Sequence, residues 1–289
     1  MTEKFQIFII IVQKDYLIGN KNENILLAAK EANKHTDLNV DIVESEEDLI
    51  KAYSDSNVDA VVRGSLKSSK IMKYLRELDK DSKIHRATYI NTDGSGFTLN
   101  VPAPGSKRGY VSSNENFEFL LSPVGIDEGN TLEERFELAI QSCKFIQSLG
   151  MEVKIAILAD GRSDDVGRSE RIDKSLEDSE KLTQMLLEEF ENNPDFDNDS
   201  EDISKHYSVK NYYILLEQAI KDKNNIIISP DGISGNILFR ALVLLNSWPS
   251  CGAVTLGIDK IFIDTSRDQS VKGYLRSLNL AYDLAKDKK

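Results

Sequence analysis

The feature that most constrains this chain is an alternation between two kinds of apolar segment. Short runs rich in β-branched and aliphatic residues predict strands at 5–12, 40–43, 58–62, 153–158, 226–229 and 261–263. Longer stretches carry apolar residues at helical spacing and predict helices at 25–32, 48–53, 70–78, 132–149, 174–190, 209–220 and 237–245. Strands that alternate with helices are typical of parallel sheets joined by crossover helices. The sequence therefore predicts an α/β fold.

Capping signals precede two of the expected helices. Thr131 with Glu134 forms a capping box, and Ser45 with Asp48 forms a weaker version of one. In such a box the hydroxyl accepts a hydrogen bond from the backbone N–H three residues further on. These positions predict where the helices 132–149 and 48–53 begin.

Two stretches interrupt the alternation. Residues 86–91 and 97–101 are extended runs around Asp93-Gly94-Ser95-Gly96, which predicts a β-hairpin. A polar stretch follows, and we expect the chain to cross from one lobe to another near 112–114. The acid-rich run 188–202, with Pro194 in its middle, predicts a surface loop.

Charge and cysteine content exclude several classes of protein. The chain has 36 Lys and Arg against 48 Asp and Glu, a formal net charge of −12. Because so acidic a surface would repel a phosphate backbone, we expect no nucleic-acid partner. Cys143 and Cys251 are too few for a disulfide scaffold. The run 5–12 is far shorter than the roughly 20 apolar residues that span a bilayer, so we expect a cytoplasmic chain without a membrane partner.

Four of the expected strands end in loops that are rich in glycine, serine and arginine. Ligands of open parallel sheets collect at the carboxyl ends of strands, where loops lead into helices. The residues concerned, in chain order, are Arg63, Gly64, Ser65 and Ser68, then Asp160, Gly161, Arg162 and Arg168, then Asp231, Ser234, Gly235 and Asn236, and finally Asp264, Thr265, Ser266 and Arg267.

These residue types favour an anionic ligand. Free N–H groups at the start of a helix attract phosphate or carboxylate, glycine lets the backbone approach closely, and arginine supplies a planar fork of donors. Glycine and serine are also the ordinary residues of turns, and surface arginine is common, so a purely structural role stays open for each loop.

Three other motifs have weaker support. Asp93-Gly94-Ser95-Gly96-Phe97 is similar to a glycine-rich cofactor loop, but such a loop must open a helix, and a strand is expected here. The run 195–199 has the alternating carboxylates of a calcium loop without its turn glycine or closing glutamate. His35, His85 and His206 lack the spacing of zinc ligands. We expect no metal site.

The C-terminal third of the chain resembles a known family. The segments 231–237 and 252–257 and the sequence Asp264-Thr265-Ser266-Arg267 are similar to the signature of the phosphate acetyl/butyryltransferases. The order and spacing of these motifs match from about residue 58 onward. Within this superfamily the loop 160–168 most resembles a small archaeal group, methanogenesis marker protein four or MtxX, which carries a methyltransferase label.

The resemblance implies a two-lobe, three-layer α/β/α fold of the phosphate acyltransferase type, which isocitrate and isopropylmalate dehydrogenases share. One lobe would comprise 1–113 plus 256–289 and the other 114–255. In the acyltransferases coenzyme A attacks an acyl phosphate in the inter-lobe cleft. The family's Ser-Arg pair matches Ser266 and Arg267. Its acidic base does not match, because Lys272 and Gly273 occupy the corresponding positions.

These observations lead to one expectation with two alternatives. We expect a transferase of the MtxX group that binds an anionic, phosphate-bearing ligand between the lobes, with Ser266, Arg267 and Asp264 as catalytic candidates and the other strand-end residues as ligand contacts. The alternatives are acyl transfer to a thiol such as coenzyme A, and a non-catalytic accessory protein. The cofactor is open between coenzyme A and a methyl donor, and a homodimer is expected by analogy.

Overall fold

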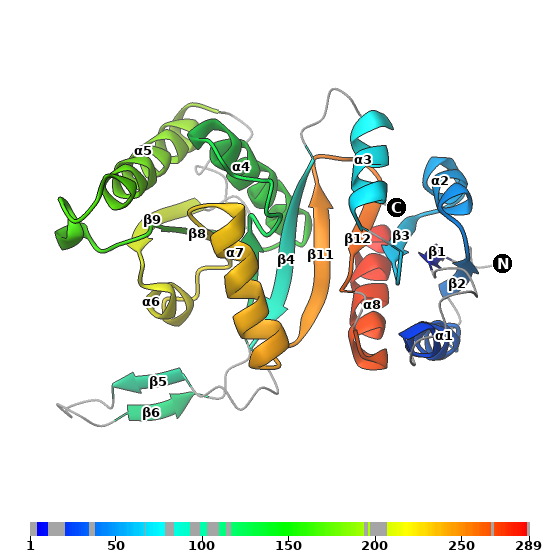
Figure 1. Cartoon of the computed structure of the whole chain (residues 1–289). Coiled ribbons are helices and arrows are strands. Elements are labelled where there is room, and N and C mark those ends of the chain that lie inside the picture. The colour runs from blue at the N-terminus through cyan, green and yellow to red at the C-terminus, as the bar shows by residue number, and fades with distance from the viewer. Residues whose placement is uncertain are drawn as a thin grey trace. The chain divides into compact units, whose positions relative to one another are not determined.

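A computed structural model describes residues 5–10, 21–34, 38–66, 68–78, 84–92, 99–102, 110–113, 117–193, 196, 207–266 and 269–287. The chain divides into two compact units (Figure 1). Unit 1 comprises Met1–His85 with Ser250–Lys289, and unit 2 comprises Arg86–Pro249. The sequence predicts other boundaries between the lobes, after residues 113 and 255, and those boundaries stay a prediction.

Unit 1 contains five strands and four helices among the described residues. The strand order is β2 (Leu38–Val43), β1 (Phe5–Ile10), β3 (Ala60–Arg63), β12 (Ile261–Asp264) and β11 (Ser250–Leu256). The first four strands are parallel, and β11 is antiparallel to β12. The helices are α1 (Lys21–Ala32), α2 (Glu46–Ser54), α3 (Ser68–Leu78) and α8 (Val271–Asp287).

The core of unit 1 lies on both faces of β3, all four residues of which are buried. Val61 packs with Leu49 of α2 and Leu75 of α3. Successive side chains of a strand point to opposite faces, so Ala60 and Val62 face the other side, where α8 contacts β3. A strand buried on both faces is largely apolar, and the apolar run Ala60–Val62 made β3 recognisable in the sequence.

The described part of unit 2 contains a sheet of five strands and a separate pair of strands. The sheet order is β4 (His85–Asn91), β7 (Glu118–Ser122), β10 (Ile226–Ile228), β8 (Val153–Leu158) and β9 (Tyr207–Tyr213). Strands β7, β10, β8 and β9 are parallel, and β4 is antiparallel to β7. The antiparallel pair is β5 (Leu99–Pro102) with β6 (Tyr110–Ser113).

The helices of unit 2 lie on both faces of its sheet. They are α4 (Leu132–Ser148), a 3₁₀ turn η1 (Ser163–Asp165), α5 (Glu170–Asn192), α6 (Leu216–Lys221), α7 (Gly232–Phe239) and a π-helical segment η4 (Arg240–Leu245). Helices α4 and α5 cover one face, and α6 and α7 cover the other (Figure 1). This arrangement follows from right-handed crossovers, because β7 to β8 and β8 to β9 run in one direction across the sheet and β9 to β10 runs back.

Both predicted caps are confirmed. Thr131 Oγ1 accepts a hydrogen bond from the N–H of Glu134 at 3.1 Å, and Ser45 Oγ accepts one from the N–H of Asp48 at 3.1 Å. In a full capping box the Glu134 carboxylate would accept a hydrogen bond from the N–H of the N-cap residue, Thr131. At α4 it accepts instead from the N–H of the preceding residue, Asn130, at 2.8 Å.

Two predicted elements are wrong. The expected helix 209–220 is divided between β9 and α6, because Tyr207–Tyr213 is extended and pairs with β8. The expected hairpin partners are strands, yet they do not pair with each other: β4 pairs with β7, and β5 pairs with β6. The turn 93–96 between them lies outside the described residues.

The acid-rich run begins as helix, since α5 continues to Asn192. Most of its remainder, including the calcium-like positions Asp195, Asp197 and Asp199, lies outside the described residues, as do His35 and His206. Phe196 is described; it is buried, with its ring centroid 5.3 Å from that of Phe190 and 5.0 Å from that of Tyr207. None of the described helices is both long enough and apolar enough to span a membrane.

Candidate functional site

The predicted site residues are divided between the two units. The residues of each unit are described separately. In unit 2 they lie where β8 and β10 end. These neighbouring strands are parallel, and the chain leaves β8 toward α5 on one face of the sheet and β10 toward α7 on the other. A point where adjacent strands send the chain to opposite faces is where open α/β sheets bind ligands.

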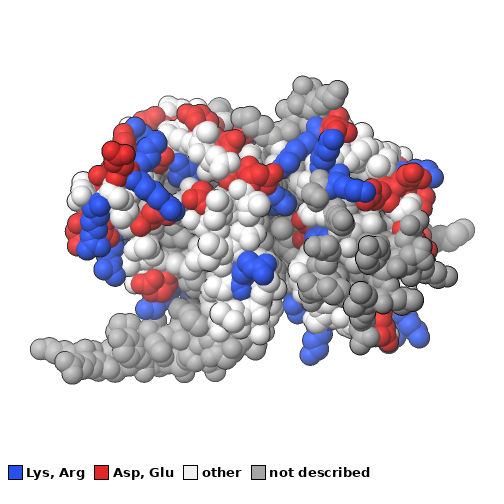
Figure 2. All heavy atoms as spheres, viewed as in Figure 1, with Lys and Arg blue, Asp and Glu red and all other residues white. Residues whose placement is uncertain are grey.

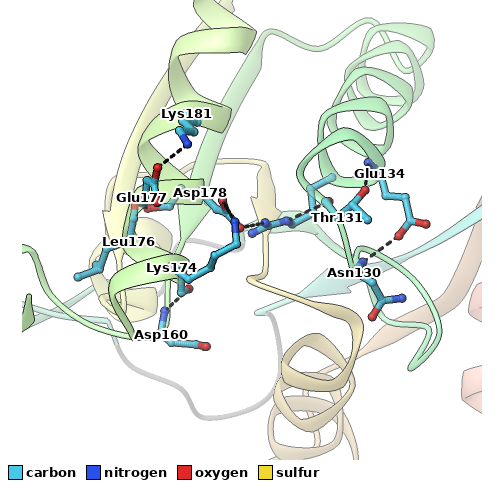
Figure 3. A network of polar contacts seen from close by, with 12 residues as sticks. Asn130, Thr131, Glu134, Asp160, Lys174, Leu176, Glu177, Asp178 and Lys181 are labelled. Atoms are coloured by element: carbon cyan, nitrogen blue, oxygen red, sulfur yellow. Dashed lines mark hydrogen bonds and ion pairs between the residues drawn. The ribbon is translucent and has the colours of Figure 1, made fainter. Parts of the chain in front are cut away.

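The loop after β8 is tied to the helix that follows it. The N–H of Asp160 donates to Ser175 Oγ at 2.9 Å, and its carboxylate pairs with Arg171 Nε at 3.1 Å. Gly161 is buried, and a Cβ there would lie 2.9 Å from Ile172 Cγ2. Figure 3 shows Asp160 at the foot of α5, on which Lys174 and Asp178 also lie. Gly161 therefore allows the loop after β8 to pack closely on α5.

Asp165 organises the arginines of the same loop. Its carboxylate accepts from the N–H of Arg162 at 2.8 Å and pairs with Arg168 Nε at 3.1 Å. The side chains of Arg168 and Arg171 are 72% and 74% exposed. Arg162 is also exposed, and no described residue forms an ion pair with its guanidinium group.

Three guanidinium groups thus stand within ten residues at the beginning of α5, a helix of 23 residues. The positive end of the helix dipole lies at the same place. Sequence analysis singled out Arg162 and Arg168 and missed Arg171, which lies inside the first turn of α5 rather than in the loop. Arg171 could have been recognised from the sequence, because Ser169 is an N-cap residue that fixes where the helix begins.

The start of α7 uses most of its predicted ligand residues for packing. Asp231 caps the helix, with its side chain accepting from the N–H of Ser234 at 2.7 Å. A Cβ on Gly232 would lie 1.7 Å from the carbonyl oxygen of Gly125, and one on Gly235 would lie 1.8 Å from that of Pro123. Asn236 Nδ2 donates to the carbonyl oxygen of Val124 at 2.9 Å.

Gly232, Gly235 and Asn236 form one face of α7, and this face rests on the backbone of the residues that follow β7. Only glycine permits so close an approach of helix to loop. Ser234 is half-buried and lies off this face. Of the four residues predicted here, Ser234 is therefore the one whose side chain is not committed to this packing.

The loop under α7 was not recognised from the sequence. Glu128 is buried, and its carboxylate accepts from the backbone N–H of Arg86 at 2.9 Å and from Arg86 Nε at 2.6 Å. The carbonyl oxygen of Glu128 accepts from the N–H of Gly232 at 3.0 Å. Gly125 and Gly129 flank this turn, but their spacing follows no familiar motif.

In unit 1 the structure brings together Arg63, Asp264 and Ser68. The guanidinium group of Arg63 is buried and donates to the Asp264 carboxylate and to the carbonyl oxygens of Leu66 and Thr265. Ser68 Oγ donates to Asp264 Oδ2 at 2.8 Å. These bonds join the carboxyl ends of β3 and β12 and saturate much of the hydrogen-bonding capacity of both charged groups.

The remaining predicted residues of unit 1 lie beside this network. Gly64 is buried and Ser65 and Ser266 are half-buried. The carbonyl oxygen of Ser266 accepts from the Tyr274 hydroxyl at 3.3 Å. Arg267 lies outside the described residues. Lys272, at one of the positions where the acyltransferases carry an acid, is exposed in the first turn of α8.

Comparison with known proteins places the chain among relatives from methanogenic archaea. It is 31% identical over 270 residues to a Methanocaldococcus jannaschii protein named "Uncharacterized methyltransferase", an alignment that covers 91% of this chain and 95% of the relative. It is 34% identical over 229 residues to "Putative methyltransferase mtx subunit X" of Methanosarcina barkeri, covering 79% and 70%. The chain belongs to the MtxX family. No protein-family model matches the chain.

The fold of this MtxX-family chain is that of the phosphotransacylases. A branched-chain phosphotransacylase of Enterococcus faecalis superposes with a TM-score of 0.60 at 14% identity, covering 96% of this chain and 99% of that one. A phosphotransacetylase of Staphylococcus aureus superposes with a TM-score of 0.56 at 14% identity, covering 99% and 96%. Both the family and the fold class predicted from the sequence are confirmed.

Proposed function

We propose that this MtxX-family chain is a transferase that binds an anionic, phosphate-bearing ligand where β8 and β10 end in unit 2. The observation that carries the proposal is the placement of Arg162, Arg168 and Arg171 at the beginning of α5, beside the strand pair whose chains leave to opposite faces of the sheet. The chain's relatives carry methyltransferase names, and methyl transfer is accordingly the first candidate reaction.

The electrostatics of the loop suit a phosphate. Two of the three arginines pair with carboxylates, Arg168 with Asp165 and Arg171 with Asp160. The arginine side chain of each pair is exposed while its carboxylate is largely buried. Ion pairs open to solvent are weak, so a doubly charged phosphate can compete for the same guanidinium groups. Arg162 can turn to the ligand without breaking an ion pair. Ser234, at the start of α7, offers a hydroxyl group from the neighbouring strand end.

Unit 1 supplies a second group of candidates, Ser266, Arg267 and Asp264. We propose Ser266 and Arg267 as contacts to the reacting group, as in the resemblance that suggested them. The Asp264 carboxylate already accepts hydrogen bonds from Arg63 and Ser68. Because these bonds tie Asp264 to the β3 end and to the start of α3, we assign this carboxylate to positioning the end of β12.

Acyl transfer to a thiol is the second candidate, and the fold shared with phosphotransacylases supports it. In that reaction the thiol sulfur bonds to the acyl carbon, the bond from that carbon to the phosphate oxygen breaks, and the thiol proton passes to a base. A free thiol has a pKa near 8.5 and needs such a base at neutral pH. Lys272 and Gly273 supply no carboxylate at the family position, which favours methyl transfer or a non-catalytic accessory role.

The proposal is tested by measuring ligand affinity, first in a thermal-shift panel of coenzyme A, acetyl phosphate, S-adenosylmethionine and inorganic phosphate at matched ionic strength. A ligand that binds only the folded state at 100 times its Kd adds about 2.7 kcal/mol of stability. We expect a shift from at least one phosphate-bearing compound. A shift from S-adenosylmethionine alone, or from none of the four, contradicts the proposed phosphate site.

The arginines are then tested in the double variant Arg162→Ala/Arg168→Ala. We expect its Kd for the phosphate-bearing ligand to rise about tenfold or more, since each charge-assisted hydrogen bond contributes about 1.5–3 kcal/mol. The matched control is Lys144→Ala/Lys221→Ala, which removes the same charge near the C-termini of α4 and α6. These helices lead into the amino ends of β8 and β10, opposite to the strand ends that carry the proposed site. Equal affinity in both double variants would place the ligand elsewhere.

A further inference from the structure

Ser266 is the point at which the chain leaves the buried end of β12. The residue before it, Thr265, is 2% exposed, whereas Ser266 is half-buried. Thr265 is tied to β3, because its carbonyl oxygen accepts from Arg63 Nη2 and its hydroxyl group donates to the carbonyl oxygen of Arg63. The backbone that leads into Ser266 is therefore fixed from the side of β3.

The carbonyl oxygen of Ser266 is tied to the start of α8. The hydroxyl group of Tyr274, in the first turn of α8, donates to this oxygen at 3.3 Å. The N–H of Gln269 donates to the same oxygen at 3.3 Å. A carbonyl oxygen has two lone pairs, so these two donors use its accepting capacity.

Tyr274 is a rigid anchor for this bond. Its side chain is 0% exposed and is among the largest that are fully buried, and α8 packs on β1, β3, β11 and β12. A phenylalanine would fill almost the same space, so packing alone does not call for the hydroxyl group. A buried tyrosine hydroxyl usually has a hydrogen-bond partner, and one partner here is the backbone of a proposed site residue.

A further tie comes from the amino-terminal helix. Asn24 Nδ2, on α1, donates to the carbonyl oxygen of Gln269 at 3.2 Å, across a separation of 245 residues. Gln269 is thus held through its N–H by Ser266 and through its carbonyl oxygen by Asn24. A Cβ on Gly273 would lie 2.2 Å from Gln269 Oε1, so glycine at position 273 leaves room for the Gln269 side chain beside α8.

We propose that Tyr274 and Asn24 are positioning residues for Ser266, Tyr274 through the Ser266 carbonyl oxygen and Asn24 through Gln269. The inference rests on the proposed function, in which Ser266 contacts the reacting group. A misplacement of about 1 Å can cost a factor of about 100 in rate, so a contact residue needs backbone that the core holds in place. Tyr274 is fully buried and acts on the ligand only through Ser266.

Both positioning contacts come from uncharged groups, so they can be removed without changing the charge of the chain. Figure 2 shows Lys, Arg, Asp and Glu side chains over much of the described surface in that view. Removing one of these charges would alter the affinity for an anion through the field of the whole protein. Tyr274→Phe and Asn24→Ala leave that field unchanged. The matched control is Tyr89→Phe, which removes a tyrosine hydroxyl that donates to Glu118 in unit 2.

The first experiment needs no ligand and measures amide hydrogen exchange at Gln269 by mass spectrometry. We expect the Gln269 N–H to exchange about fivefold faster in Tyr274→Phe than in the wild type, because local opening no longer breaks the bond from Tyr274. Asn24→Ala should have a similar effect, and Tyr89→Phe should have none. Unchanged exchange in both Tyr274→Phe and Asn24→Ala, or equal acceleration in Tyr89→Phe, overturns the proposal.

The second experiment measures the Kd of acetyl phosphate and of coenzyme A by calorimetry in a double-mutant cycle. For the compound that binds, we expect Ser266→Ala to raise the Kd about tenfold and Tyr274→Phe about fivefold, since a hydrogen bond to a charged group is stronger than an ordinary one. Residues that act through one another are not additive. The double variant should therefore stay within about twofold of Ser266→Ala, whereas independent effects would multiply to about 50-fold.

The outcomes separate this inference from the proposed function. If Ser266→Ala raises the Kd but Tyr274→Phe does not, or if the two effects multiply, the positioning role is wrong and the proposed contact of Ser266 stands. If Ser266→Ala binds as well as the wild type, or if the wild type binds neither compound, the role proposed for Ser266 is wrong and the inference fails with it.

Discussion

At the scale of single residues, Gly235 decides how α7 lies on its unit. Alanine favours helix over glycine by about 1 kcal/mol, so Gly235→Ala would stabilise an isolated helix. Here the new Cβ would lie 1.8 Å from the carbonyl oxygen of Pro123. Because that atom is backbone and cannot rotate away, the clash outweighs the helix propensity. We expect Gly235→Ala to lower the free energy of unfolding by about 3 kcal/mol, measured by urea denaturation.

The control for this prediction is Gly150→Ala. Gly150 has a φ of +68° and nothing within 4 Å of the added Cβ, so it should lose only about 1 kcal/mol, from the left-handed backbone. Equal losses in the two variants would show that steric contact with the loop 123–128 is not what selects glycine at position 235.

At the scale of elements, a buried ion pair joins α4 to α5. Arg135 and Asp178 are both buried, with Arg135 Nη2 2.9 Å from Asp178 Oδ2. Asp178→Asn keeps the volume but leaves the Arg135 charge without a counter-ion, and removing one partner of a buried pair costs about 3–5 kcal/mol. We expect a loss of about 3 kcal/mol in the free energy of unfolding by chemical denaturation. Glu177→Gln, the exposed neighbour that pairs with Lys181, should change stability little, and a comparable loss there would contradict the assignment.

The elements also show what the sequence could and could not predict. Buried parallel strands such as β3 and β10 were recognisable because Ala60–Val62 and Ile226–Ile228 are uninterrupted apolar runs. The stretch 209–220 was misassigned because Tyr207–Tyr213 is an edge strand held by β8, a long-range pairing that no local pattern reveals. The strand-end motifs predict a candidate site, but the sequence could not distinguish an exposed arginine such as Arg168 from a buried one such as Arg63. That difference depends on which neighbouring strand supplies a carboxylate.

At the scale of the whole molecule, the two units differ in which parts of the chain form them. Unit 2 is one continuous segment, Arg86–Pro249, whereas unit 1 needs both ends of the chain. Strand β3 pairs with β12, some 200 residues away, and α8 packs on β1, β3, β11 and β12. A fragment of residues 1–85 therefore lacks the strand and the helix that cover half of its core.

We therefore expect residues 86–249, expressed alone, to unfold cooperatively in urea with a circular dichroism spectrum of mixed helix and strand. Residues 1–85 alone should show no cooperative transition, because the apolar side chains of β3 that face α8 would be exposed to water, and burial of such area is the main favourable term in folding. Joining 250–289 to 1–85 through a short glycine-serine linker should restore the transition. Cooperative unfolding of 1–85 by itself, or its absence from 86–249, would mean that the folding units do not follow this division, and that the carboxyl-terminal strands and α8 contribute less to unit 1 than their contacts indicate.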